Sequence, residues 1–130
     1  MMPKILIIDD SLPNRELLGE ILKGIGICDF AECGRSAVSA YNRSLRQKDF
    51  YDVILLDIDL PGVNGLQLLK KIRESEQVAG IALGDGVPII MVTAYDQRFL
   101  EAFEIGCNDY VVKPIDSDML IKKVKKHLPQ

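Results

Sequence analysis

Short aliphatic runs alternate along the chain with longer amphipathic stretches. The three strongest runs occupy residues 5–8, 53–56 and 89–92, and two weaker runs occupy residues 27–31 and 110–112. Runs that are apolar on both faces are typical of central strands in a parallel sheet, covered by helices on each side. The run at 27–31 is weaker because Asp29 interrupts it. The pattern therefore predicts five strands.

Apolar residues recur at helical spacing after each of these runs. The predicted helical stretches are residues 17–25, 34–48, 66–72, 99–106 and 120–128. Pro13 and Asp116 are typical of helix starts, and Gly106 is typical of a helix end. Five strands that alternate with five helices predict a single α/β domain, a doubly wound open sandwich with right-handed crossovers. A closed eight-fold barrel would need about twice as many residues.

Composition excludes several classes of protein. The net charge of −3 lacks the basic excess of most nucleic-acid-binding domains, and no apolar run approaches the length of a membrane span. The start of the chain lacks the apolar stretch of a signal peptide. Cys28, Cys33 and Cys107 form no C-x-x-C pair, which favours apolar packing in a reducing compartment. We therefore expect a cytoplasmic domain without direct nucleic-acid or membrane binding.

Polar residues that could bind a ligand or take part in a reaction follow four of the predicted strands. They are Asp9 and Asp10, Asp57, Thr93, and Lys113. Parallel strands end at the same edge of a sheet, where open α/β sheets bind ligands, so these side chains should meet in one cleft. Each residue alone is more often a turn, cap or surface residue. Their joint occurrence at strand ends is hard to explain by turn chemistry.

Three carboxylates gathered in one cleft repel one another unless a cation lies among them. A ligand set of oxygens without His or Cys suits a hard ion, most plausibly Mg²⁺. A metal ion, the Thr93 hydroxyl and the Lys113 ammonium could together neutralise the oxygens of a phosphoryl group. The sequence thus predicts a magnesium-dependent phosphoryl site.

These motifs resemble the receiver domains of two-component response regulators, in particular the chemotaxis response regulators, over the whole of residues 1–130. The residues that carry the resemblance are Asp9-Asp10, the stretch 55–65 around Asp57, Thr93-Ala94, and residues 110–114. The resemblance implies a flavodoxin-like (βα)5 three-layer sandwich with strand order 2-1-3-4-5. It also implies a receiver without an output domain in this chain.

The resemblance assigns a role to each motif residue. Asp57 is the phospho-acceptor. Asp10, Asp57 and the main-chain carbonyl of Asp59 are the direct ligands of Mg²⁺, and Asp9 holds the ion through water. Thr93 and Ala94 bind phosphoryl oxygens.

The resemblance also implies that Lys113 forms an ion pair with the phosphate. Thr93 and Tyr110 form the switch, in which Tyr110 turns inward after the hydroxyl of Thr93 moves toward the phosphate. The Lys113–Pro114 peptide bond is expected to be cis, since only X-Pro bonds reach that form cheaply.

The implied partners are a sensor histidine kinase or a histidine phosphotransfer protein upstream, and a protein target downstream. The output surface would comprise the fourth helix, the last strand and the last helix, and a homodimer through that surface is left open. The chain would catalyse only its own phosphotransfer and dephosphorylation, so it would not be an enzyme in the ordinary sense.

Two features depart from the core pattern, and the last helix carries several lysines. Asp59 and Tyr95 occupy positions that tune the lifetime of the phosphate, and Asp59 could repel hydroxide or orient a water. Residues 75–87 form a long, glycine-containing connection at the far edge of the sheet, which we interpret as a tolerated surface insertion; a partner-specific lobe is the alternative. The lysines of the last helix are interpreted as a solvated face, and His127 as a residue of a fraying terminus.

Two alternatives remain from the residues alone. Asp57 and Asp59 form a D-x-D pair like that of haloacid-dehalogenase phosphatases, but the order of the acidic motifs and the lack of a cap domain argue against this hydrolase. A structural receiver that no longer accepts phosphate is disfavoured by the complete set of motif residues.

Overall fold

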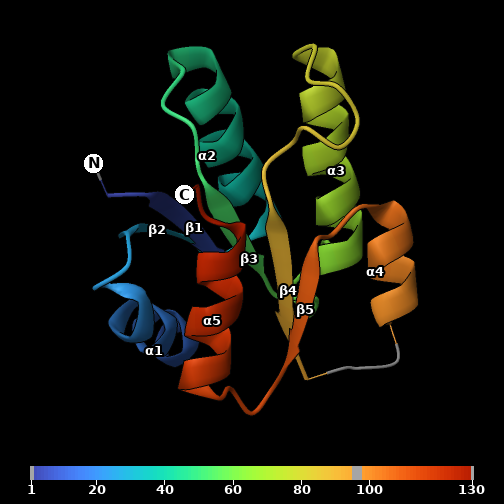
Figure 1. The fold of residues 1–130 in the computed structure, drawn as a ribbon. Coiled ribbons are helices and arrows are strands. Elements are labelled where there is room, and N and C mark those ends of the chain that lie inside the picture. The colour runs from blue at the N-terminus through green and yellow to red at the C-terminus, as the bar shows by residue number, and fades with distance from the viewer. Residues whose placement is uncertain (1, 95–97, 130) are drawn as a thin grey trace.

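The computed structural model describes residues 2–94 and 98–129. Five parallel strands form one sheet in the order β2-β1-β3-β4-β5, and a helix follows each strand (Figure 1). The elements are β1 (Lys4–Ile8), α1 (Leu12–Leu22), β2 (Ile27–Ala31), α2 (Gly34–Gln47), β3 (Val53–Leu56), α3 (Gly65–Val78), β4 (Ile89–Thr93), α4 (Phe99–Ile105), β5 (Asp109–Val112) and α5 (Ser117–His127). The predicted architecture and strand order are confirmed.

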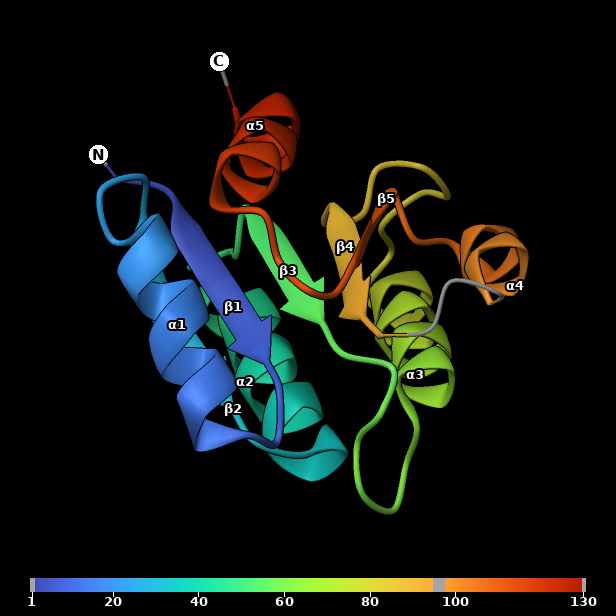
Figure 2. The same ribbon diagram turned by 90° about the horizontal axis from the view of Figure 1, so that it is seen from below.

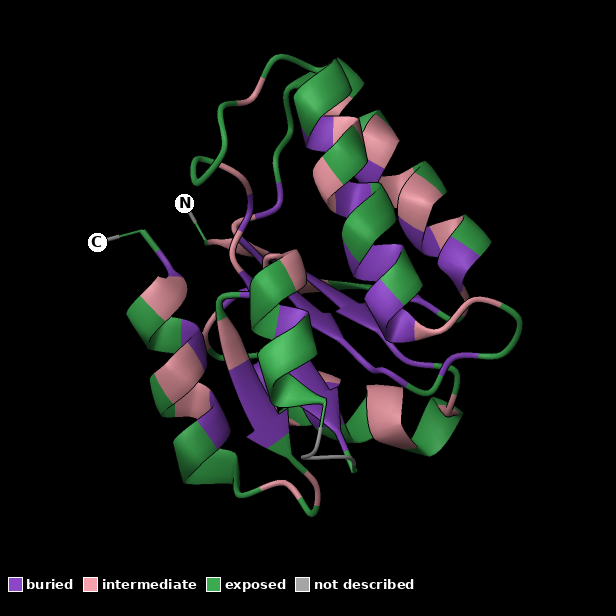
Figure 3. Ribbon diagram, turned by 90° about the vertical axis from the view of Figure 1, so that its right-hand side faces the viewer, coloured by how far each residue is buried: buried purple, intermediate pink, exposed green. Residues whose placement is uncertain are grey.

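Helices cover both faces of the sheet (Figure 2). Alternate side chains of β1 enter two separate cores: Leu6 and Ile8 pack with α2, α3 and α4, and Ile5 and Ile7 pack with α1 and α5. The central strands are buried along their length, whereas the outer faces of the helices are exposed (Figure 3). Burial of the aliphatic strands on both sides supplies the main driving force for the fold.

Side-chain caps fix the starts of three helices. Ser11, Asn64 and Asp116 accept hydrogen bonds from main-chain N–H groups in the first turns of α1, α3 and α5, at 3.3, 2.9 and 3.2 Å. The predicted cap at Asp116 is therefore confirmed. The first helix ends at Leu22, so Ile25 lies beyond it and not within it as expected.

The connection predicted over residues 75–87 is shorter than expected. Helix α3 continues to Val78, because Glu76 turns inward and is buried with only 4% of its surface exposed. Its carboxylate accepts hydrogen bonds from the main-chain N–H of Val87 and the hydroxyl of Tyr41. The connecting segment, residues 79–88, is thereby fastened at the edge of the sheet opposite the carboxyl ends of the strands (Figure 1).

Within the part of the chain that the structure describes, every helix is too short or too polar to cross a lipid bilayer.

Candidate metal centre

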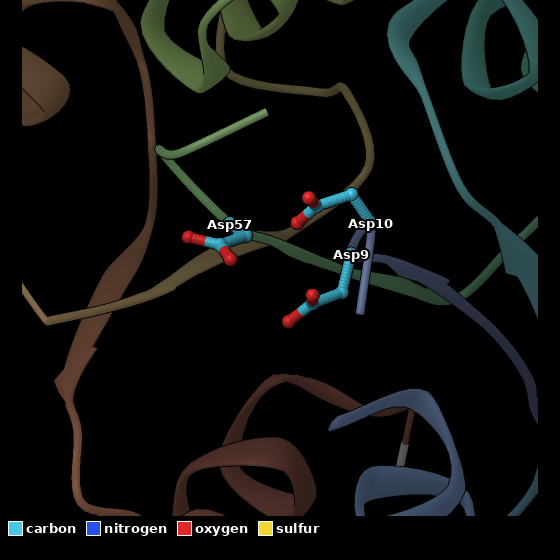
Figure 4. Close-up of side chains that lie close together, drawn as sticks. All are labelled: Asp9, Asp10 and Asp57. Atoms are coloured by element: carbon cyan, nitrogen blue, oxygen red, sulfur yellow. The ribbon is translucent and has the colours of Figure 1, made fainter. Parts of the chain in front are cut away.

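Three aspartates from two neighbouring strands meet at the carboxyl edge of the sheet (Figure 4). Asp9 and Asp10 follow β1, and Asp57 follows β3, which pairs directly with β1. The main-chain N–H of Asp57 donates to the carbonyl of Ile8 at 3.0 Å and continues the pairing to the end of the strand. One carboxylate oxygen from each aspartate lies within 4.8 Å of the others. The predicted acidic cluster is present.

Asp9 is the most buried member, with 1% of its surface exposed. Its Oδ1 accepts a hydrogen bond from the N–H of Ser11 at 2.9 Å, whereas its buried Oδ2 has no hydrogen-bond partner within the described residues. The ammonium of Lys113 lies 3.5 Å from Oδ2, an ion-pair distance. Burial raises the pKa of Asp9, although the Ser11 N–H and Lys113 oppose the rise. The hydrogen bond from Ser11 and the charge of Lys113 therefore do not fully offset the cost of burying the Asp9 carboxylate.

Asp57 is also buried, and each of its oxygens has one partner. Oδ1 accepts from the N–H of Asp59 at 3.0 Å, and Oδ2 lies 3.2 Å from the Nζ of Lys113. A single lysine therefore faces two buried carboxylates, with the exposed Asp10 beside them. An excess of negative charge with a free buried oxygen fits a hard divalent cation such as Mg²⁺, which prefers oxygen ligands.

The fourth strand and the last strand contribute the remaining predicted residues of the site. Thr93 is the last residue of β4 and is fully buried, and its carbonyl accepts a 2.7 Å hydrogen bond from the N–H of Lys113. This bond holds the lysine-bearing loop against the end of β4. Ala94 follows at the surface. The Lys113–Pro114 peptide bond is cis, as expected.

Asp59 and Tyr95 are the two positions expected to tune the lifetime of the phosphate, and only Asp59 lies within the described residues. Asp59 is exposed, near enough to Asp57 and Asp10 to feel their charges. Partial desolvation and the charge of Asp57 raise the pKa of Asp59, against the opposing charges of Arg98 and Lys113. Sequence reasoning did not single out Arg98. Tyr95 lies outside the described residues.

Tyr110, the expected switch residue, is buried in this structure with 9% of its surface exposed. Its ring meets that of Phe99 edge to face, with the ring centroids 6.4 Å apart. The side chain thus packs between β5 and α4, next to the surface where an output partner was expected.

Two further residues that shape the site carried no clear signal in the sequence. Gly65 begins α3 so close to the end of β3 that a Cβ there would lie 2.3 Å from the carbonyl oxygen of Asp57. Only glycine tolerates this approach. Arg15 donates a 2.8 Å hydrogen bond to the main-chain carbonyl of Asp9. The contact of Gly65 with the end of β3 depends on tertiary packing, which the local sequence does not show.

Comparison with known families gives one consistent result. The profile of the response regulator receiver domain matches residues 5–125, which is most of the chain.

Individual proteins agree with this match. The chemotaxis protein CheY of Pseudomonas aeruginosa is 30% identical over 125 residues, which cover 95% of this chain and 94% of that protein. The sensory transduction protein LytT of Bacillus subtilis is 31% identical over 126 residues, 97% of this chain but 48% of LytT. A hybrid signal transduction histidine kinase of Dictyostelium discoideum is 32% identical over 130 residues, 98% of this chain and 7% of that kinase. The chain therefore spans about half, or far less, of some relatives.

Solved structures agree as well. The response regulator TrrA of Thermotoga maritima, in complex with Mg²⁺ and beryllofluoride, is 34% identical with a TM-score of 0.78, over 98% of this chain and 100% of that one. The CheY of Borrelia burgdorferi, in a complex with CheX, beryllofluoride and Mg²⁺, is 26% identical with a TM-score of 0.81, over 95% and 87% of the two chains.

Proposed function

The chain belongs to the response regulator receiver domain family of two-component signalling, and we propose that Asp57 is the residue that accepts the phosphoryl group. The observation that carries this proposal is the environment of Asp57. Its carboxylate lies beside Lys113 at 3.2 Å and within a cluster of acidic oxygens that suits Mg²⁺. Asp10, Asp57 and the carbonyl of Asp59 would hold the ion, and Asp9 would hold it through water.

The transfer needs alignment and neutralisation of charge. An oxygen of Asp57 attacks phosphorus, the new O–P bond forms as the N–P bond of a phosphohistidine donor breaks, and the imidazole nitrogen keeps the electron pair. Lys113 already lies 3.2 Å from the attacking carboxylate of Asp57 and would pair with the oxygens of the incoming phosphoryl group. Bound Mg²⁺ would supply the rest of the charge neutralisation. Thr93 and Ala94 would donate to the oxygens of the product.

The product would act as a switch. New negative charge on Asp57 would draw the Thr93 hydroxyl toward the phosphoryl group and shift the segment after β4. Tyr110 packs against Phe99 at the start of α4, so a movement of this segment would reach the exposed face of α4, β5 and α5. That face would contact the downstream protein or a second copy of the chain.

The partners follow from the same assignment. The donor would be a sensor histidine kinase or a histidine phosphotransfer protein. The chain would catalyse only its own phosphorylation and dephosphorylation. Asp59 would affect the lifetime of the phosphate. Family membership gives no support to the phosphatase alternative built on Asp57 and Asp59.

Intact-mass spectrometry after incubation with acetyl phosphate and Mg²⁺ tests the proposal. The unmodified chain should gain one phosphoryl group, and Asp57→Asn should gain none. Asp59→Asn is the matched control, because it removes a neighbouring carboxylate that is exposed, and it should still be labelled. Undiminished labelling of Asp57→Asn would refute the acceptor assignment.

A further inference from the structure

Helix α2 carries an unbalanced positive charge. Residues 33–48 contain no Asp or Glu, but they contain Arg35, Arg43, Arg46 and Lys48, all exposed. None of these four side chains makes a salt bridge to any residue in 2–94 or 98–129. The chain as a whole is negative, at −3, so this helix differs in sign from the rest of the molecule.

Stability of the helix accounts for only part of this pattern: Arg46 and Lys48 lie at the C-terminal end of α2, where the helix dipole favours cations. Arg35 lies in the first turn, where the helix dipole disfavours a cation, and Arg43 and Arg46 are like charges one turn apart. A glutamate four residues from any of them would stabilise the helix. By contrast, α1, α3 and α5 each mix acidic and basic residues. Arg35 and the repulsion between Arg43 and Arg46 cost local stability, which favours a role in contact with a negatively charged partner.

An apolar groove lies beside these charges. It runs between α2 and α3, which pack side by side on one face of the sheet (Figures 1 and 3), and has a volume of about 500 Å³. Val38, Leu45 and Val78 line it, and Val78 is 90% exposed. The charged residues that line it are Arg46 from α2 and Lys71 and Glu74 from α3, two cations and one anion.

We propose that the outer face of α2 and its groove with α3 dock an acidic amphipathic helix of another protein. Apolar side chains one or two turns apart would fill the groove over Val38, Leu45 and Val78. Carboxylates on either side would pair with the exposed arginines and Lys71. Charge complementarity selects an acidic partner, and the apolar floor selects a protein helix over a nucleic acid, whose phosphates would leave Val78 uncovered.

The groove is separate from the aspartate cluster, although Arg35 lies at the start of α2, on the same edge of the sheet as the cluster. The lining residues Leu45, Arg46, Val78 and Ala79 lie at the C-terminal ends of their helices, toward the edge of the sheet opposite Asp57. Docking therefore requires no phosphorylation and should persist in Asp57→Asn. It differs in this respect from a contact through α4, β5 and α5.

Nuclear magnetic resonance titration of the full chain tests the proposal with defined probes. The first is a synthetic helix of about 20 residues with leucines on one face and glutamates elsewhere; the second replaces each glutamate by glutamine. The third probe is duplex DNA of random sequence. The acidic peptide should shift amide signals in residues 35–48 and 71–79, and affinity should fall as salt rises.

Variants distinguish binding to this surface from nonspecific attraction of an acidic peptide to any basic region of the protein. The triple variant Arg35→Ser, Arg43→Ser, Arg46→Ser should bind the acidic peptide about tenfold more weakly. The matched control removes three exposed lysines of α5, with Lys122→Ser, Lys125→Ser and Lys126→Ser, and should change affinity by at most about twofold.

Val78→Ser removes only exposed apolar surface and should weaken binding about threefold without loss of folding. Signal shifts that map to α4 or α5 would overturn the proposal. So would equal losses in the two triple variants, equal binding of the glutamine peptide, or tighter binding of DNA through the same arginines.

Discussion

Two buried carboxylate sites lie at opposite edges of the same sheet, and they differ in how their charge is satisfied. Glu76, at the amino edge, accepts from the Tyr41 hydroxyl at 2.5 Å, the Val87 N–H at 2.8 Å and the Arg73 guanidinium at 2.8 Å. Asp9, at the carboxyl edge, has one fully buried oxygen without a hydrogen bond in the described residues. Burial is similar, at 4% and 1% exposed.

The surroundings extend this contrast. Arg73 also donates to the carbonyl of Gly106 at 2.8 Å and to Asn108 at 2.9 Å, so the network around Glu76 ties α2, α3 and the loop before β5 together. Burial and the neighbouring Glu76 raise the pKa of Tyr41 and keep its hydroxyl a donor. The complete network is a structural anchor, whereas the incomplete one at Asp9 is a site prepared for a ligand.

Removal of the anchor should have the largest effect on stability. Glu76→Ala leaves the Arg73 charge, the Tyr41 hydroxyl and the Val87 N–H without their shared acceptor, and should cost about 3 kcal/mol of unfolding free energy. Urea unfolding measures this loss. Glu74→Ala, at an exposed position of the same helix, is the control and should change stability by less than about 0.5 kcal/mol. Equal effects would show that the network is not an anchor.

A bound cation should complete the other site. Mg²⁺ at about one hundred times its dissociation constant should raise the unfolding free energy by about 2.7 kcal/mol, and a chelator should reverse the gain. Thermal unfolding with and without the ion measures this effect. Asp10→Asn should lose most of the gain, while Glu76→Ala should keep it. Stabilisation that survives loss of the Asp10 carboxylate would place the ion elsewhere.

Asp9→Asn should reveal the cost of the incomplete site. Without Mg²⁺ the substitution removes repulsion from Asp57 and the burial of an under-compensated charge, so stability should rise by about 1 kcal/mol. With Mg²⁺ bound, the unmodified protein should become the more stable of the two, because the neutral amide of the Asp9→Asn variant would bind the ion more weakly than the Asp9 carboxylate does. Equilibrium unfolding at neutral pH measures both values. A loss of stability in the absence of metal would mean that the Asp9 charge is already well satisfied.

The contact between α5 and β5 should have an effect of similar size that depends on pH. Burial would raise the pKa of Asp109, but hydrogen bonds from His127, the Tyr110 N–H and Lys123 hold it below the usual value. A lowered pKa in the folded state adds stability above the unfolded value of 3.8, and this stability is lost as pH falls through the folded pKa. Asp109→Asn should cost about 1 kcal/mol at pH 7.

That cost should disappear in acid. Unfolding measured in steps from neutral pH down to about pH 3 should show the wild-type advantage shrinking below the ordinary aspartate range. A difference that stays constant across this interval would contradict the assignment.

The main features of the fold could be predicted because they repeat along the chain. Each aliphatic run marked a strand, and Asp9, Asp57 and Thr93 stood at strand ends, so topology alone placed them near one another. Contacts that depend on packing between distant elements could not be predicted. Glu76 appeared to be a polar residue of a surface connection, but it faces Tyr41 from α2 across the interior.

The last helix gives a second example. His127 was interpreted as a residue of a fraying terminus and the lysines as a solvated face. In the structure His127 lies 3.0 Å from Asp109, and Lys123 donates a 2.7 Å hydrogen bond to the carbonyl of Tyr110. Both interpretations are wrong for these two residues, because the partner strand is set by the sheet order and not by local sequence. The remaining exposed lysines fit the expected solvated face.

The most direct test of the central claim is to locate the acyl phosphate itself. Reduction of the acetyl phosphate-treated protein with borohydride converts a phosphorylated aspartate to homoserine, and peptide sequencing by mass spectrometry then identifies the residue. The account predicts homoserine at position 57 alone, and only when Mg²⁺ is present. Homoserine at position 10 or 59, or equal conversion without the metal, would contradict it.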